Sequence, residues 1–449
     1  MTALLYRADF GADFVWGTAT AAFQIEGATN TDGRGASVWD TFSLKRGAIK
    51  TGDNALIACD FYNRYVADIA LNKAMGFTAF RFSISWSRVL PQGTGRVNEA
   101  GLAFYDRVID ECIRQGQTPW ITLFHWDLPQ ALEDRGGWTN WGVLDWFAGY
   151  VTLIVKAFGH KVKHWFVLNE PSAFTILGYL VGMHAPGRRS FMSIPAVIHH
   201  AALAQADGGR IIREHVPGAI IGTTFSCSPV EPISPLKRDV QAAQRANALL
   251  NRLFIEPALG LGYPVQELPF LKLIDKRFAR PGDRERLAFN FDLIGLQHYF
   301  RVVVEHSVLV PYLWARDVSP NRRSVEAVTE MGWEVHPASM LQILRQFSLY
   351  DGSHKLVVAE SGAAFYDRVE EGQVVDTARM AYHVQCLQQV RQAKAEGIDL
   401  AGYFVWTLLD NFEWAEGYRP RFGLVHVDHR TQQRIIKQSG HWFRQFLAG

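Results

Sequence analysis

The sequence of 449 residues contains little cysteine. Its four cysteines stand far apart and form no CxxC pair, which argues against both a zinc knuckle and a disulfide framework. They are Cys59, Cys112, Cys227 and Cys386. Scattered free cysteines are typical of proteins in a reducing compartment.

Long hydrophobic runs are also missing. No stretch reaches the roughly 18 apolar residues that a membrane-spanning helix needs. The N-terminal stretch MTALLYRADFGADF is interrupted by Arg7 and Asp9 and is too short for a secretory signal peptide. Together with the cysteine pattern, these absences predict a soluble, cytoplasmic protein with no membrane partner.

Neither sign of charge dominates. Lys and Arg number 46 against 44 for Asp and Glu, so the net charge is +2. This balance leaves no basic surface for nucleic acid. His199 and His200 fall in a helix-like segment without nearby carboxylate ligands, so we expect no metal there, and we expect no other cofactor.

Tryptophan, in contrast, is abundant, with 14 residues. Each indole N–H needs a partner when buried, so a surplus of tryptophan suggests stacking surfaces in a cleft. Ordinary core packing accounts for about half of these residues on this interpretation.

Short β-rich runs alternate with segments of helical spacing. The expected strands are 14–18, 77–84, 118–124, 164–168, 220–225, 293–299, 356–359 and 403–406. Segments 62–76, 102–116 and 380–397 have helical spacing, and each ends at a glycine suited to a C-cap. The strands show little polar alternation, as parallel strands buried on both faces do.

Eight strands separated by helices predict an α/β protein, a single (β/α)8 TIM barrel over residues 1–449. A doubly wound sheet is the structural alternative, but no GxGxxG fingerprint follows an early strand and no P-loop is present. A barrel places the active site at the C-terminal ends of its strands.

Seven of the eight strand ends carry polar or aromatic side chains fit to contact a ligand. They are Gln24, Arg81, the triplet His125-Trp126-Asp127, the pair Asn169-Glu170, Tyr299, Glu360, and Trp406 with Glu413 and Trp414 beyond it. A random surface would show more Lys and Ser and fewer His, Trp and amides.

Two of these residues, Glu170 and Glu360, end apolar strands that lie across the barrel mouth from each other. Paired carboxylates flanking a bond suit glycoside hydrolysis, in which one protonates the leaving oxygen and the other attacks or activates water. Each also has a structural alternative: Glu170 as a carboxylate at a helix start, Glu360 as a turn residue.

The predicted roles require that Glu360 is ionised while Glu170 is protonated. Arg81 and the Tyr299 hydroxyl are expected to keep Glu360 ionised, and the charge of Glu360 is expected to raise the pKa of Glu170. When Glu360 carries a sugar its charge is gone, so the pKa of Glu170 falls and it acts as a base.

The neighbouring residues suit a sugar. Trp406 offers a flat face to a pyranose ring, and Trp333 is expected to stack on the attached group. Hydroxyl partners are Gln24, His125, Asn169, Glu413 and the indole of Trp414, and Trp126 is a further substrate-binding candidate.

The chain resembles the family 1 glycoside hydrolases, the β-glucosidase family, along nearly its whole length. The motifs that carry the resemblance are FVWGTATAAFQIEG, FRFSISWSR, LFHWDLPQAL, LNEP, ESGAAF and WTLLDNFEWAEGYRPRFGLVHVD, in this order. The resemblance implies a barrel and a retaining mechanism with Glu170 as acid/base and Glu360 as nucleophile. It also implies contacts to the sugar from Gln24, His125, Asn169, Trp406, Glu413 and Trp414, with Trp333 near the aglycone.

The chain departs from the family pattern at three positions. Ser361 replaces the usual Asn after the nucleophile, and Gln297-His298-Tyr299 replaces Asn-Tyr-Tyr. Gln297 is one methylene longer than Asn, which puts its contacts in question.

Other activities remain open on the residues alone. A β-glucosidase acting on small β-glucosides or oligosaccharides is favoured, with galactose and fucose as alternative sugars. A 6-phospho-β-glycosidase is disfavoured because Glu413 would repel a dianion, although Arg419 and Arg421 lie nearby. An inverting hydrolase and an inactive sugar-binding barrel are further alternatives. Aglycone choice is assigned to loops 182–194 and 302–325, and the oligomeric state stays undetermined.

Overall fold

The computed structural model describes residues 5–352 and 354–449. The first four residues of the N-terminal stretch considered above therefore lie outside the described part of the chain. Within the described ranges, no helix is both long enough and apolar enough to span a bilayer.

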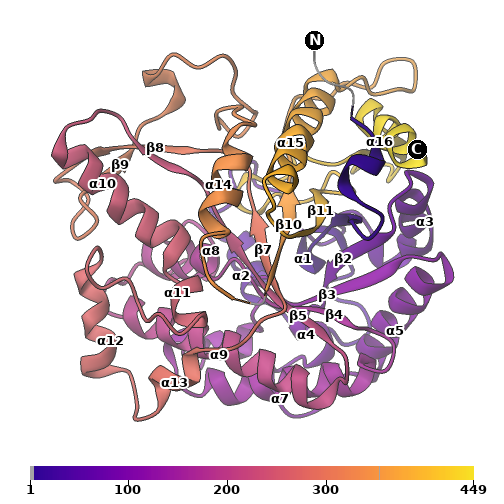
Figure 1. Ribbon diagram of the computed structural model, residues 1–449. Helices are drawn as coiled ribbons and strands as arrows, with labels where there is room; N and C mark the ends of the chain where they lie inside the picture. The colour runs from indigo at the N-terminus through magenta and orange to yellow at the C-terminus, as the bar shows by residue number, and fades with distance from the viewer. Residues whose placement is uncertain (1–4, 353) are drawn as a thin grey trace.

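Eight parallel strands close into a barrel in the order β1-β11-β10-β7-β5-β4-β3-β2 (Figure 1). Their bounds are β1 Val15–Ala19, β2 Ala79–Ser83, β3 Thr118–Phe124, β4 His164–Asn169, β5 Ile220–Ser226, β7 Leu293–Gln297, β10 Lys355–Ser361 and β11 Leu400–Trp406. Each overlaps one of the eight predicted strands. The (β/α)8 barrel is confirmed. A doubly wound sheet is excluded because the last strand in this order, β2, pairs with the first, β1, so the sheet closes and has no edge strand.

The strands are apolar because both of their faces are covered. Side chains of one face fill the barrel, and those of the other pack under the helices. In β2 all five residues are buried, including the charged Arg81. A buried arginine needs acceptors for its five N–H groups, so its presence marks a polar place inside the barrel.

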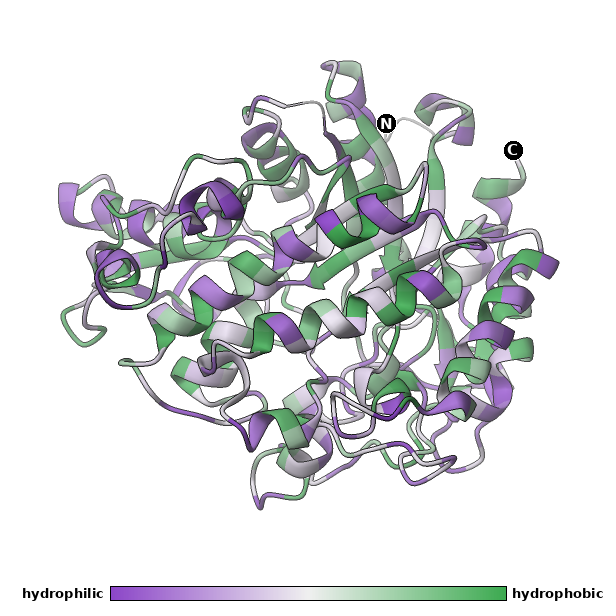
Figure 2. Cartoon of the chain, turned by 90° about the horizontal axis from the view of Figure 1, so that it is seen from below, coloured by the Kyte–Doolittle hydropathy of each residue, from purple (hydrophilic) through white to green (hydrophobic). Residues whose placement is uncertain are grey.

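Helices surround the barrel (Figure 1). The three predicted helices are α3 Phe61–Ala74, α5 Glu99–Arg114 and α15 Thr377–Ala395. Others in the ring are α7 Val143–Phe158, α9 Ile194–His215, α14 Ser339–Phe347 and α16 Gln438–Ala448. Hydrophilic residues gather on the outer helices and loops in Figure 2, with hydrophobic ones along the central strands.

The glycines that follow the three predicted helices adopt the expected left-handed backbone. Gly76, Gly116 and Gly397 have φ of 89°, 68° and 89°. Residues with a Cβ rarely adopt this conformation, which ends a helix and turns the chain toward the next strand.

Two small sheets lie outside the barrel, and sequence patterns did not indicate them. One joins β6 Val230–Pro232, β8 Val302–His306 and β9 Ala315–Asp317; the other is the hairpin of β12 Val425–Val427 and β13 Arg434–Ile436. Segment 302–325, expected to be a loop, thus supplies two strands. Short strands whose partners lie far away in the chain leave little periodic signal.

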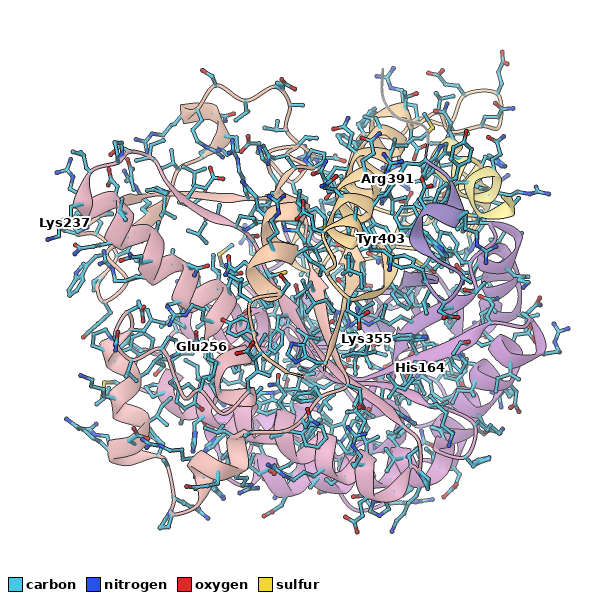
Figure 3. All side chains as sticks on the ribbon, viewed as in Figure 1. His164, Lys237, Glu256, Lys355, Arg391 and Tyr403 are labelled. Atoms are coloured by element: carbon cyan, nitrogen blue, oxygen red, sulfur yellow. The ribbon has the colours of Figure 1, made fainter. Side chains whose placement is uncertain are left out.

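The two ends of the barrel differ in character. His164 and Lys355, labelled in Figure 3, begin β4 and β10. His164 stacks on Trp120 with ring centroids 4.3 Å apart, and Lys355 is exposed. The opposite, C-terminal ends of the same two strands carry Glu170 and Glu360.

Candidate active site

A cavity of about 360 Å³ opens at the C-terminal ends of the barrel strands. Nine of the twelve predicted site residues line it: His125, Trp126, Glu170, Tyr299, Trp333, Glu360, Trp406, Glu413 and Trp414. Arg81, Asn169 and Gln24 lie behind this wall and reach the cavity through their neighbours. The strand-end prediction therefore locates the cavity.

Glu360 is the most heavily hydrogen-bonded carboxylate of the cavity. Arg81 donates from Nη1 to its Oε1 over 2.6 Å, and the Tyr299 hydroxyl donates to its Oε2 over 2.6 Å. Its side chain is almost fully buried. Glu360 belongs to strand β10, so the alternative that it is a turn residue is wrong.

Gln297 is a further partner of Glu360 that the sequence analysis left in question. Its amide nitrogen Nε2 donates to Oε1 of Glu360 over 2.6 Å and to Oδ1 of Asn169 over 2.5 Å. The longer side chain thus makes contacts with both. Strand pairing places Gln297 directly beside Glu360, a register that was not deduced from the sequence.

Glu170 follows β4 with a left-handed backbone, φ 45°. Its side chain does not cap helix α8 Pro171–Thr175, so the helix-start alternative finds no support in the structure. It accepts a hydrogen bond of 3.3 Å from Nδ2 of Asn169. Strained backbone conformations of this kind concentrate at functional sites.

Burial raises the pKa of both acids. At Glu170 the negative charge of Glu360 adds to this effect, and the pKa ends well above its ordinary value. At Glu360 the charge of Arg81 and the hydroxyl of Tyr299 oppose burial, so Glu360 is the more acidic of the two. Burial, which the sequence analysis did not include, is the larger cause at Glu170.

Asn169 links the two acids. Its Oδ1 accepts from Arg81, Thr224 and Gln297 at 2.5, 3.0 and 2.5 Å. Its Nδ2 therefore turns toward Glu170 and toward Nε2 of His125, 3.0 Å away. The orientation of the amide follows from the three donors around its oxygen.

Gln24, on the short helix α1 Ala22–Ile25, holds the loop that carries Glu413. Its Nε2 donates to the carbonyl of Phe412 over 2.9 Å and to Oε2 of Glu413 over 3.4 Å. Burial, followed by the charge of Glu360, raises the pKa of Glu413 to about 8. The expected repulsion of a sugar phosphate therefore rests on a charge that Glu413 largely lacks at neutral pH.

Aromatic rings form one wall of the cavity. Trp414 packs against Trp126 and Trp39 with ring centroids 4.5 and 4.6 Å away. The indole of Trp126 donates to the carbonyl of Asn169 over 2.9 Å. Part of the tryptophan surplus thus forms this wall, with Trp126 and Trp414 at the surface of the cavity and Trp39 buried behind them.

The fifth strand also contributes, although its end carried no candidate. Ser226, the last residue of β5, lines the cavity, and Thr224 bonds Asn169. Serine and threonine are common everywhere on protein surfaces, so their type alone gave no signal.

The other departures from the family pattern point away from the acids. His298 is buried with Nδ1 3.0 Å from the carbonyl of Cys227 and Nε2 2.7 Å from the Ser339 hydroxyl. Burial lowers its pKa to about 4, so it is neutral. Ser361 is buried in β10, where it pairs with Val405 of β11.

The expectation that His199 has no carboxylate nearby is wrong. Its Nε2 lies 3.0 Å from Oδ2 of Asp283, a carboxylate 84 residues further along the chain. His200 instead bonds the carbonyl of Trp138 over 2.8 Å. Over the ranges that the structure describes, no three His, Cys, Asp or Glu side chains gather as a metal site would require.

Comparison with known proteins gives the family of the chain. The family model described as glycosyl hydrolase family 1 matches residues 6–449. The chain is a family 1 glycosyl hydrolase. This hydrolase is 42% identical to a 1,4-beta-D-glucan glucohydrolase of Thermotoga neapolitana, over 98% of both chains. It is 41% identical to beta-glucosidase A of Thermotoga maritima, over 97% of this chain and 96% of that one.

Solved structures of relatives share the fold. The family 1 β-glucosidase from Thermotoga maritima superimposes with a TM-score of 0.93 at 40% identity, over 98% of each chain. The same enzyme in complex with deoxynojirimycin gives a TM-score of 0.93 at 41% identity, again over 98% of each chain. The family 1 hydrolase described here is a glycoside hydrolase, and the alternative of an inactive sugar-binding barrel loses its basis.

Proposed function

We propose that this hydrolase is a retaining β-glucosidase in which Glu360 is the nucleophile and Glu170 the acid/base. The observation that carries the proposal is the unlike surroundings of two acids in one cavity. Glu360 receives hydrogen bonds from Arg81, Tyr299 and Gln297. Glu170 is hydrogen-bonded only by neutral groups, the amide of Asn169 at 3.3 Å and the side chain of Ser226, and no cation contacts it in the described part of the chain.

In the first step the ionised Glu360 attacks the anomeric carbon of the bound glucoside. The bond from that carbon to the aglycone oxygen breaks, and the proton of Glu170 passes to this oxygen. A glycosyl ester on Glu360 results. The charge of Arg81 and the hydroxyl of Tyr299 lower the pKa of the carboxylate, and this favours the ionised form that attacks.

The second step reverses the role of Glu170. Esterification removes the negative charge of Glu360, which is one cause of the raised pKa of Glu170. The pKa of Glu170 then falls, so it takes a proton from water as the water attacks the anomeric carbon. The Glu360 carboxylate is released, and glucose leaves with its original β configuration.

Glucose is the proposed sugar because the similar proteins are named for glucosides and glucans. The pair of Gln24 and Glu413, with Trp406 and Trp414 beside it, supplies hydroxyl partners and flat faces for the ring. A 6-phospho sugar is disfavoured on different grounds from those expected. Arg421 is engaged by Asp410 and Arg419 by Glu330, so both nearby arginines already have carboxylate partners.

The proposal extends to the whole chain. We infer that residues 1–449 act as one catalytic domain on small β-glucosides, with no nucleic-acid or membrane partner. The four buried free cysteines support a cytoplasmic location.

Product stereochemistry tests the proposal. Hydrolysis of a nitrophenyl β-glucoside is followed by proton NMR before the sugar mutarotates. We expect β-glucose as the first product. First appearance of α-glucose would mean an inverting reaction, and faster turnover of the 6-phosphate or of the β-galactoside would mean a different sugar.

A further inference from the structure

Tyr299 reaches Glu360 from a segment that lies beyond the barrel ladder. Strand β7 ends at Gln297, and Tyr299 follows in neither helix nor strand. The N–H of His298 makes the last backbone hydrogen bond before it, to the carbonyl of Glu360 over 3.0 Å. Among the described residues, neither the N–H nor the carbonyl of Tyr299 bonds to another main-chain group. Its position therefore depends on side chains.

The other two donors to Glu360 are placed differently. Arg81 belongs to β2 and Gln297 to β7, so the pairing of barrel strands fixes the main chain of both. Tyr299 is the one donor of the three whose main chain lies outside a strand. Its hydroxyl nevertheless donates to Oε2 of Glu360 over 2.6 Å, a distance that allows little displacement.

Tyr382 of helix α15 supplies the missing attachment. Its hydroxyl donates to the main-chain carbonyl of Tyr299 over 3.1 Å, across 83 positions of sequence. Tyr382 is only 2% exposed. Two hydrogen bonds in series thus run from α15 to the carboxylate of Glu360, one to the main chain of Tyr299 and one from its side chain.

Packing alone does not account for a tyrosine at position 382. Its ring belongs to a small hydrophobic cluster with Ala363 and Cys386, against which Val335 and Phe365 pack. A phenylalanine ring would fit the same apolar surroundings. A buried hydroxyl is costly unless it is hydrogen-bonded, so the tyrosine is explained by the carbonyl that it holds.

Aromatic packing around Tyr299 does not replace this hydrogen bond. The ring of Trp333 lies 5.7 Å away and that of Phe422 6.1 Å away, centroid to centroid. Apolar contacts are not directional, so they tolerate small shifts of the ring. A hydrogen bond weakens steeply when its angle or length changes. The hydroxyl of Tyr299 therefore needs a directional attachment at its main chain.

We propose that Tyr382 is a positioning residue for the nucleophile: by holding the carbonyl of Tyr299, it keeps the Tyr299 hydroxyl on Glu360. The inference rests on the proposed function, in which Glu360 attacks the sugar. When the hydroxyl of Tyr382 is removed, Tyr299 donates to Glu360 less effectively. The ionised form of Glu360 is then less favoured, and fewer enzyme molecules can attack at a given pH.

The charged and titratable groups around Glu360 determine the readout. Arg81 from β2 and the Tyr299 hydroxyl favour its ionised form, and the negative charge of Glu360 acts in turn on Glu170 and Glu413. Tyr382→Phe leaves all of these groups in the chain and changes only how well Tyr299 is held. The acidic limb of kcat/KM against pH reports the ionisation of the free enzyme's nucleophile.

The test measures kcat/KM of Tyr382→Phe for a nitrophenyl β-glucoside across pH. We expect a loss of about three- to tenfold, the range for one neutral hydrogen bond, and an acidic limb displaced to higher pH. Tyr403→Phe is the matched control, because Tyr403 (labelled in Figure 3) is equally buried and its hydroxyl lies 3.2 Å from Nδ1 of His383 instead. It should keep the wild-type profile, and urea unfolding compares the stability of the two variants.

A double variant shows whether the effect passes through Tyr299. In Tyr299→Phe the hydroxyl that Tyr382 positions is already gone, so adding Tyr382→Phe should cause no further loss of kcat/KM. Losses that add in full would mean that the two residues act independently.

The outcomes separate the two proposals. A wild-type pH profile in Tyr382→Phe overturns the positioning role, as does the same displacement in Tyr403→Phe or full additivity with Tyr299→Phe. Each of these results leaves the glucosidase function intact. Failure of the wild-type protein to hydrolyse a nitrophenyl β-glucoside instead overturns the proposed function.

Discussion

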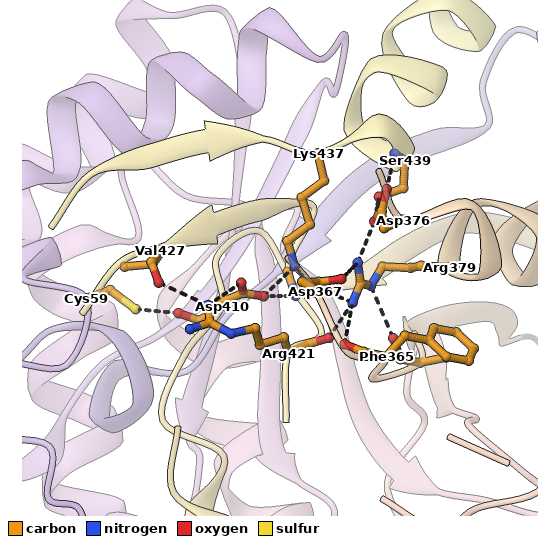
Figure 4. A network of polar contacts seen from close by, with 12 residues as sticks. Cys59, Phe365, Asp367, Asp376, Arg379, Asp410, Arg421, Val427, Lys437 and Ser439 are labelled. Carbon is orange, nitrogen blue, oxygen red and sulfur yellow. Dashed lines mark hydrogen bonds and ion pairs between the residues drawn. The ribbon is translucent and has the colours of Figure 1, made fainter. Parts of the chain in front are cut away.

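Two buried clusters of charge in this hydrolase contain three carboxylates each and differ in their cations. Among the residues that the structure describes, one buried cation contacts the active-site acids Glu170, Glu360 and Glu413: Arg81, which pairs with Glu360. The second cluster, drawn in Figure 4, joins Asp367, Asp376 and Asp410 to Arg379, Arg421 and Lys437. The active-site cluster therefore has one cation for three carboxylates, whereas the second cluster has three cations for three carboxylates.

This difference in balance decides how the carboxylates titrate. In the second cluster burial alone would raise the pKa of Asp410, but Lys437, Arg421 and Arg379 lower it to about 2. Lys437 donates to Asp410 over 2.6 Å and to Asp367 over 2.5 Å. In the active site the pKa of Glu413 instead rises to about 8.

The balanced cluster also has a place in the architecture. In the chain, Asp410 lies between β11 and Glu413, and Lys437 directly follows the hairpin strand β13. The ion pair thus ties the loop that carries Glu413 and Trp414 to the C-terminal segment. Neutral, fully paired charge anchors the structure, whereas unbalanced charge leaves acids able to exchange protons near neutral pH.

The largest expected effect comes from removing the centre of the unbalanced cluster. Glu360→Ala is expected to lower kcat/KM for a nitrophenyl β-glucoside by a factor on the order of 10⁵, because no other group can take the sugar. Calorimetric titration with deoxynojirimycin checks that the cavity still binds. Sodium azide should restore turnover and yield the α-glucosyl azide. Unchanged activity would refute the nucleophile assignment.

Glu170→Gln is expected to reduce kcat/KM by roughly 10²- to 10⁴-fold for a glucoside with a poor leaving group, the range for loss of a general acid. A dinitrophenyl β-glucoside, whose leaving group needs no proton, should lose far less in the first step. The fall of kcat/KM at high pH should also vanish, because it reports loss of the proton from Glu170. Equal losses for both substrates would contradict the acid role.

Lys437→Met breaks the balance of the second cluster. Leaving a buried carboxylate without its partner costs about 3–5 kcal/mol in the free energy of unfolding. Urea unfolding at pH 7 measures the change, and Lys355→Met, at an exposed lysine (Figure 3), is the control. Equal stability of both variants would show that the cluster contributes nothing.

The same cluster predicts an acid dependence of the wild-type stability. The folded pKa of Asp410 lies below its ordinary value, so its contribution is complete above the unfolded pKa and is lost as pH falls toward about 2. The shift from 3.8 to about 2 corresponds to about 2 kcal/mol. The free energy of unfolding, measured by urea titration at pH values from 5 to 2, should fall by this amount in the wild type. It should fall by less in Lys437→Met.

Gln297→Met should have the smallest effect and still sharpen the comparison. Removing a donor from Glu360 disfavours its ionised form, so the acidic limb of kcat/KM against pH should move to higher pH. We expect about a tenfold loss of kcat/KM, as for one hydrogen bond to a charged group. Gln205→Met is the matched control, because Gln205 is equally buried and bonds Thr223 instead. An unmoved acidic limb would make Gln297 merely a packing residue.

Much of the barrel was predictable from the sequence because its strands are apolar on both faces and end abruptly in polar residues. The run from Phe166 to Leu168 stops at Asn169 and Glu170, and β4 ends there as well. The sheet of β6, β8 and β9 was not predictable, since β6 and β8 pair residues more than 70 positions apart, such as Val230 with Val302.

The candidate site shows the same division. The residue types at Glu170, Glu360, Arg81 and Tyr299 indicated acid chemistry, because such groups are costly at the ends of buried strands. The residue type of Gln297 gave no such indication of a role in the site. Its role depends on strand register, which sets it beside Glu360 and which no local pattern reveals.

By itself, the sequence determined the barrel, the strands that bear the two acids and the reaction class, because periodicity and residue type are local properties of the chain. Only the tertiary structure decided that Gln297 also donates to Glu360, why burial raises the pKa of Glu413 to about 8, and which segments line the cavity. These properties depend on distances between residues far apart in the chain and on their burial from water.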